Sequence, residues 1–153
     1  MIAISLAEIA KAIDGELIIG SSASQETLVS GSVETDSRLV KPGSLFFAKP
    51  GEVTDGHLFV PAAVQNGATA AVVERYLTEQ NDIAQIIVKD VVLALGKLAG
   101  YVLQSIRAVS DLKVIGITGS NGKTTTKNML REILSTAGET IAPIESYNNE
   151  VGA

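Results

Sequence analysis

The segment with the clearest chemical potential is a glycine-rich string, GITGSNGKTTT, which runs from Gly116 to Thr126. It follows an apolar stretch of strand length and precedes an amphipathic helix pattern, the setting of loops that bind phosphate groups. Glycines let the main chain turn sharply, so that its N–H groups and the positive end of the following helix face an anion. Lys123 can then reach the terminal phosphates, and the Thr124 hydroxyl can ligate Mg²⁺. The string therefore predicts a site for ATP or GTP.

The predicted nucleotide-binding residues are Gly119, Ser120, Asn121, Gly122, Lys123, Thr124 and Thr125. The string departs from the strict GxxxxGK[ST] spacing, because Ile117 stands where that spacing requires a glycine. The competing interpretation is a glycine-rich turn followed by a solvated lysine. The strand and helix patterns on either side favour nucleotide binding over it.

Further motifs stand on both sides of this loop. Before it, in order, come ETDSR at 34–38, PGSLFFA at 42–48, GEVTDGH at 51–57 and NGA at 66–68; after it comes SYNNEVG at 146–152. Together with the loop these strings resemble the Mur ligases, which build the peptide stem of bacterial cell-wall precursors. The last string is similar to the MurF branch, which joins D-alanyl-D-alanine to UDP-MurNAc-tripeptide. The resemblance implies an ATP-dependent carboxylate–amine ligase that needs Mg²⁺ and works through an acyl phosphate.

The resemblance also implies roles for residues of the first motifs. Binding of the UDP part of the substrate falls on Thr35, Ser37, Arg38, Glu52, Val53 and Thr54. Arg38 is the obvious cation for an anionic ligand, with pairing to Asp36 as its alternative. Asp36 itself has two alternatives, which are to fix its own turn or to contact substrate. His57, the one histidine of the chain, is interpreted as structural rather than catalytic.

On the ATP side, the resemblance makes Lys123 the catalytic cation and implies that Thr124 and Glu150 hold Mg²⁺. Asn148 or Asn149 would contact substrate or nucleotide. For Glu150 the alternative is an ordinary surface glutamate after a turn. No residue stands out as the base for the incoming amine.

Helical and extended patterns alternate along the chain, which is typical of the α/β class. Helices are expected from a capping box at Ser5, near 59–66, after Asp90 and over 123–137, and strands at 17–19, 45–48, 70–73, 86–88, 113–117 and 140–142. We therefore expect a small mixed-sheet UDP-binding domain at 1–110, then at 111–153 the first βαβ unit of a P-loop ATPase domain. One such unit cannot cover a parallel sheet, so we expect the front part of a longer protein, inactive alone.

Composition and charge argue against several classes of protein. The 153 residues carry 12 Lys+Arg against 17 Asp+Glu, a net charge of −5, which argues against a nucleic-acid binder. There is no cysteine, no signal-peptide pattern and no uninterrupted apolar run of membrane-spanning length, so we expect a cytoplasmic protein without a membrane span. We expect the intact enzyme to be monomeric and the isolated piece to be prone to self-association.

Other interpretations stay open. The chain could come from a MurE-type or cyanophycin-synthetase-like ligase, or serve only as a nucleotide-sugar binding module. A folylpolyglutamate-type ligase fits less well, since its loop continues GKG where this one has Gly122-Lys123-Thr124. A regulatory P-loop switch would leave the motifs between Glu34 and Ala68 unexplained.

Overall fold

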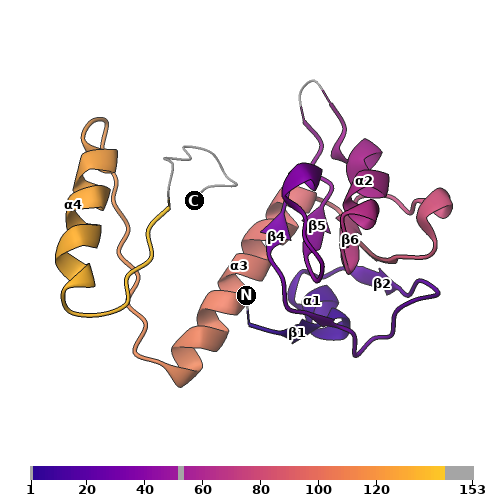
Figure 1. Ribbon diagram of the computed structural model, residues 1–153, viewed down its shortest axis with the longest axis horizontal. Coiled ribbons are helices and arrows are strands. Elements are labelled where there is room, and N and C mark those ends of the chain that lie inside the picture. The colour runs from indigo at the N-terminus through magenta and orange to yellow at the C-terminus, as the bar shows by residue number, and fades with distance from the viewer. Residues whose placement is uncertain (1, 52–53, 144–153) are drawn as a thin grey trace. The chain divides into compact units, whose positions relative to one another are not determined.

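The computed structural model describes residues 2–51 and 54–143 of the chain (Figure 1). It divides into two compact units, Met1–Ser105 and Ile106–Ala153. The division falls five residues before the boundary expected between residues 110 and 111, and that boundary stays a prediction. Each unit is described by itself below.

The first unit is built on a five-stranded sheet with the strand order β2-β7-β6-β5-β4. Its strands are β2 (Glu16–Ile18), β4 (Val33–Glu34), β5 (Leu45–Phe47), β6 (Ala70–Val73) and β7 (Ala84–Ile87). β4, β5, β6 and β7 run parallel, whereas β2 pairs antiparallel with β7. A separate two-stranded sheet joins β1 (Ile4–Ser5) to β3 (Leu28–Val29). The mixed α/β sheet expected for this unit is confirmed.

Helices cover both faces of this sheet (Figure 1). They are α1 (Leu6–Ala12), α2 (Val60–Gln65) and α3 (Val91–Val109), with short 3₁₀ turns η1 (Ser37–Leu39), η2 (Gly56–Phe59) and η3 (Thr78–Gln80). The predicted capping box is present at α1: the Glu8 N–H donates to Ser5 Oγ, and the Ser5 N–H donates to a Glu8 carboxylate oxygen.

Strand alternation divides the core into two clusters. Phe46 and Phe47 are adjacent in β5 and both are fully buried, so their side chains leave opposite faces of the sheet. Phe47 packs with residues of α1 and α3, such as Ile9 and Leu98, while Phe46 packs with Val60 of α2. Because helices pack against both faces of the sheet, the parallel strands are buried on both sides.

The helix α3 has one face in this core, where Val91, Ala94 and Leu98 are buried. Midway along it, the Lys97 ammonium pairs with Asp14 at 2.7 Å. Within the described part of the chain α3 is the one helix whose length and hydropathy would allow it to cross a membrane. That is weak evidence, since the core helix of a soluble domain passes the same test.

The second unit contains α4 (Lys123–Ser135), as predicted, and none of its described residues is buried. The two strands expected beside it, at 113–117 and 140–142, are absent from the described residues. A strand needs a neighbour for its backbone N–H and C=O groups, and neither segment has one among the described residues of this unit. The expected βαβ unit is therefore represented by its helix alone.

Candidate functional site

The parallel strands place the described residues among the predicted UDP-binding set at one edge of the sheet. Because β4 and β5 run in the same direction, the turns that follow them lie at the same end (Figure 1). Thr35, Ser37 and Arg38 come directly after β4, and Thr54 lies in the turn after β5. In open α/β sheets, ligands bind at the carboxyl ends of the strands. We call this end, formed by the segments after β4, β5, β6 and β7, the carboxyl edge.

The turn after β4 is fixed by its own side chains. Asp36 caps η1 by accepting the Arg38 N–H at 3.0 Å, and its carboxylate pairs with the Arg38 guanidinium at 2.5 Å. These Arg38 hydrogen bonds lower the pKa of Asp36 to about 2. The Arg38 side chain remains 86% exposed. Asp36 thus fixes its own turn and is the internal partner of Arg38, while contact of Asp36 with substrate stays a prediction.

Ser37 is held from the other side by a residue far along the chain. The Asn66 side-chain amide donates to the Ser37 carbonyl oxygen at 2.9 Å, which ties η1 to the end of α2. Ser37 itself is buried, whereas Thr35 is exposed at the surface of the carboxyl edge. Asn66 thus gives the NGA string a structural role.

The turn after β5 closes on itself. The Gly51 N–H donates to the Thr54 carbonyl at 3.0 Å, and the Gly56 N–H donates to the Lys49 carbonyl at 3.1 Å. A Cβ on Gly56 would lie 2.4 Å from the Lys49 oxygen, so only glycine fits there. Glu52 and Val53, both predicted UDP-binding residues, lie outside the described residues.

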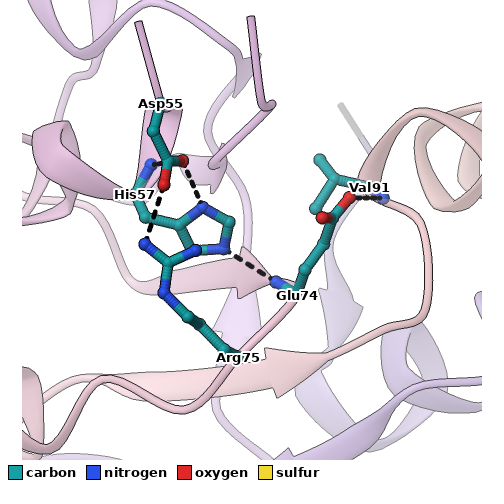
Figure 2. Close-up of polar contacts among 5 residues, drawn as sticks. All are labelled: Asp55, His57, Glu74, Arg75 and Val91. Atoms are coloured by element: carbon teal, nitrogen blue, oxygen red, sulfur yellow. Dashed lines mark hydrogen bonds and ion pairs between the residues drawn. The ribbon is translucent and has the colours of Figure 1, made fainter.

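Behind this turn lies a polar network that sequence reasoning missed in part (Figure 2). Asp55 accepts hydrogen bonds from the His57 N–H at 3.0 Å and from the Arg75 guanidinium at 2.7 Å, and it contacts His57 Nδ1 at 2.6 Å. These bonds hold the pKa of Asp55 well below its usual range, and the bond from Arg75 has the largest effect. His57 is buried in the network, consistent with a structural role. Glu74 and Arg75 directly follow β6, and that position was the signal that could have identified them.

The phosphate loop belongs to the second unit. Gly119 has φ +147° and Gly122, the N-cap of α4, has φ +77°, conformations that residues with a Cβ rarely adopt. Lys123 is the first residue of the helix, and its ammonium donates to the Gly119 carbonyl at 2.5 Å. The loop therefore closes into a local ring through the contact between Lys123 and Gly119.

The remaining loop residues lie around this ring. Ser120 and Asn121 are exposed between the two glycines, and Thr124 and Thr125 are exposed in the first turn of α4. The N–H groups in the first turn of a helix point toward its N-terminal end, a direction that suits an anion. Among the described residues, no three acidic, histidine or cysteine side chains gather as a metal site. The predicted residues Asn148, Asn149 and Glu150 lie outside the described part.

Comparisons with known proteins place both units in one family. The model "Mur ligase family, catalytic domain" matches residues 31–102, and "Mur ligase middle domain" matches residues 117–153. The UDP-N-acetylmuramoyl-tripeptide--D-alanyl-D-alanine ligase of Escherichia coli is 40% identical over 152 residues, which is 99% of this chain and 31% of that protein. The chain thus spans about a third of the length of the curated relatives it matches.

Solved structures agree with this similarity. MurF from Acinetobacter baumannii matches with a TM-score of 0.83 and 37% identity, over 98% of this chain and 31% of that one. MurF ligase from Thermotoga maritima in complex with ADP matches with a TM-score of 0.58 and 34% identity, over 71% of this chain and 24% of that one. With two family models, a curated relative and these structures in agreement, the chain belongs to the Mur ligase family.

Proposed function

We propose that this chain is part of an ATP-dependent, MurF-type ligase of the cytoplasm that joins D-alanyl-D-alanine to UDP-MurNAc-tripeptide in peptidoglycan precursor synthesis. The observation that carries the proposal is that the similarity to that ligase extends over 99% of the chain, through both the carboxyl edge and the phosphate loop. The two regions suit different anions. The carboxyl edge suits the diphosphate of a UDP-linked precursor, and the phosphate loop suits the phosphates of ATP.

At the carboxyl edge, the proposed UDP ligand meets hydroxyl and backbone groups. Thr35 and Thr54 are exposed there, and the buried Ser37 contributes its backbone at the start of η1. Arg38 can reach a diphosphate by exchanging its pairing with Asp36, a contact that water already screens. Glu52 and Val53 complete the proposed set by resemblance.

At the phosphate loop, catalysis requires activation of the tripeptide carboxylate. A carboxylate oxygen attacks the γ-phosphorus of ATP, the bond to the ADP oxygen breaks, and an acyl phosphate forms. The D-alanyl-D-alanine amine then attacks the acyl carbon, phosphate leaves, and the amine loses a proton. The two anions repel each other, so Lys123 and the N–H groups of Gly122 and Thr124 are proposed to offset that charge.

Mg²⁺ fits the chemistry of this loop. The Thr124 hydroxyl is an oxygen donor in the helical turn that follows Lys123, and Mg²⁺ prefers oxygen ligands. When bound, the ion would neutralise charge on the phosphate oxygens. Thr124 is the proposed ligand within the described residues, with Glu150 beyond them; Asn148 or Asn149 is proposed to contact substrate or nucleotide.

Calorimetric titration of this 153-residue chain with UDP-MurNAc-tripeptide tests the assignment. We expect saturable binding of the tripeptide precursor and much weaker binding of UDP-glucose, because the family motifs of the edge are all present. UDP-MurNAc-dipeptide distinguishes the MurE-type alternative, which predicts equal or tighter binding of the dipeptide form. Equal binding of UDP-glucose, or no binding at all, would contradict the assignment.

A second function applies to the chain by itself. Because no described residue of the second unit is buried, the chain alone is suited to bind a UDP-linked precursor without turning over ATP. The same titration with ATP hydrolysis measured in parallel tests this binding-module function. Binding without hydrolysis supports it, and hydrolysis coupled to the precursor contradicts it.

A further inference from the structure

A hydrogen-bonded path through His57 and Glu74 connects the segments that follow β5, β6 and β7 at the carboxyl edge. His57 stands in η2, after β5, and only 3% of the residue is exposed. Its Nε2 accepts the backbone N–H of Glu74, the residue after β6, at 2.9 Å. The Glu74 carboxylate in turn accepts the N–H of Val91, the first residue of α3 after β7, at 3.1 Å. Figure 2 shows this continuous path.

These contacts determine where the ring carries its proton. Nε2 accepts a hydrogen bond from a backbone amide, so it holds no proton itself. The proton of the neutral ring is then on Nδ1, where it is donated to Asp55 Oδ1 at 2.6 Å. The Asp55–His57 contact is a hydrogen bond of a neutral ring rather than an ion pair, and Asp55 selects the tautomer that leaves Nε2 free to accept.

The geometry points to His57 as a positioning residue of the carboxyl edge, whose Nδ1–H tautomer fixes the turn after β5 against Glu74 after β6, and the Glu74 carboxylate in turn holds the start of α3 after β7. Asp55, which the ring and the backbone N–H of His57 hold, directly follows Thr54 in this turn. A shift of this turn changes the shape that a UDP group meets at the edge. The consequence for binding rests on the proposed function; the positioning itself does not.

Two substitutions of His57 test the hydrogen bonds of its two ring nitrogens separately. His57→Gln can place a carbonyl oxygen near the position of Nε2 and keep an acceptor for Glu74, whereas His57→Asn can keep a donor for Asp55 but leaves the Glu74 N–H unpaired. We expect His57→Asn to weaken UDP-MurNAc-tripeptide binding about tenfold and His57→Gln to weaken it less than about threefold. Rescue by glutamine is a result that general loss of packing would not give.

The experiment begins with the ligand-free 153-residue chain. Long-range ¹H–¹⁵N NMR spectra of the ring should show Nδ1 protonated and Nε2 unprotonated, and the Glu74 amide should exchange slowly with solvent. That exchange should accelerate in His57→Asn and stay slow in His57→Gln. Calorimetry with UDP-MurNAc-tripeptide then measures the binding ratio. Val29→Ala, in the buried core at β3, is the control that lowers stability without touching the network.

The outcomes are distinguishable. A ring protonated on Nε2, or Glu74 exchange equal in the wild type and both variants, overturns the positioning role. If the wild type does not bind the precursor, the proposed function fails while the ring spectrum and amide exchange still decide the role of His57. If both variants unfold, Asp55→Asn, which alters a partly exposed residue, replaces them. It removes the carboxylate that holds the ring, so it should speed Glu74 exchange, and unchanged exchange contradicts the role.

Discussion

The carboxyl edge and the phosphate loop hold their functional groups in opposite ways. At the edge, the deciding contacts join residues 29 positions apart, as in Asn66 to Ser37, or 17 apart, as in Glu74 to His57. In the loop, the contact from Lys123 to Gly119 spans four residues, and two glycine conformations shape the rest. The edge therefore depends on the folded core of the first unit, whereas the loop depends on its local sequence. Mutations should affect the two regions independently.

The largest effect is expected at Lys123. In a full-length ligase that contains this chain, Lys123→Ala should lower ATP turnover about a thousandfold or more, because it removes the cation that offsets charge on the transferred phosphoryl group. Binding of UDP-MurNAc-tripeptide should stay within about twofold of the wild type, since the edge does not depend on this side chain. Steady-state kinetics and calorimetry measure the two quantities. Joint loss of both would show that the two regions are not separate sites.

The next largest effect is expected in the core behind the edge. Phe47→Ala should lower the free energy of unfolding by about 3–5 kcal/mol, because it removes a fully buried aromatic ring from the cluster that joins α1, α3 and the sheet. The matched change in the second unit, Ile133→Ala, should change it by less than about 0.5 kcal/mol, since Ile133 is 61% exposed. Urea unfolding followed by circular dichroism compares the two. Similar losses would mean that the units share one core.

The sequence predicted the local features of both regions. The capping box at Ser5, the helix that starts at Lys123 and the glycine requirement of its loop all follow from neighbours within a few residues. The two-residue strands β1, β3 and β4 were missed because so short a segment has no detectable periodicity. Their existence depends on partners elsewhere in the sheet.

The network around His57 could not be read from spacing. Nothing in the string GEVTDGH shows that its histidine meets the backbone after a strand 17 residues later. Only the parallel pairing of β5 with β6 brings the two together. The reverse error occurred in the second unit, where apolar strings at 113–117 and 140–142 predicted strands that find no partner among the described residues. Local pattern proposes a strand, and pairing decides whether it forms.

A moderate effect is expected from the glycine conformation of the phosphate loop. Gly122→Ala forces a Cβ into the left-handed region at φ +77°, which should cost about 1–2 kcal/mol and weaken ADP binding about tenfold in a full-length ligase. No atom lies near the added Cβ, so strain rather than collision is being measured. Gly96→Ala, within α3 and equally free of neighbours, should be neutral or slightly stabilising. Equal effects of the two changes would contradict a conformational role for Gly122.

The smallest effect is expected at acidic pH, in a comparison of Asp55, which has a distant partner, with Asp36, which has a local one. The pKa of Asp55 is lowered in the folded chain, so its contribution to stability is complete above the unfolded value near 3.9 and is lost as the pH falls toward the folded value. Asp55→Asn should therefore lower the melting temperature by about 2–4 °C at pH 7, with the difference from wild type shrinking below about pH 4.

Asp36→Asn removes a carboxylate whose pKa is also low, but whose partner Arg38 is only two residues away. Because so local a contact can persist in the unfolded chain, its pH-dependent difference should be smaller than that of Asp55. Melting curves from pH 2.5 to 7 for both variants test this order, and a larger change at Asp36 would contradict the view that distant contacts are what hold the carboxyl edge.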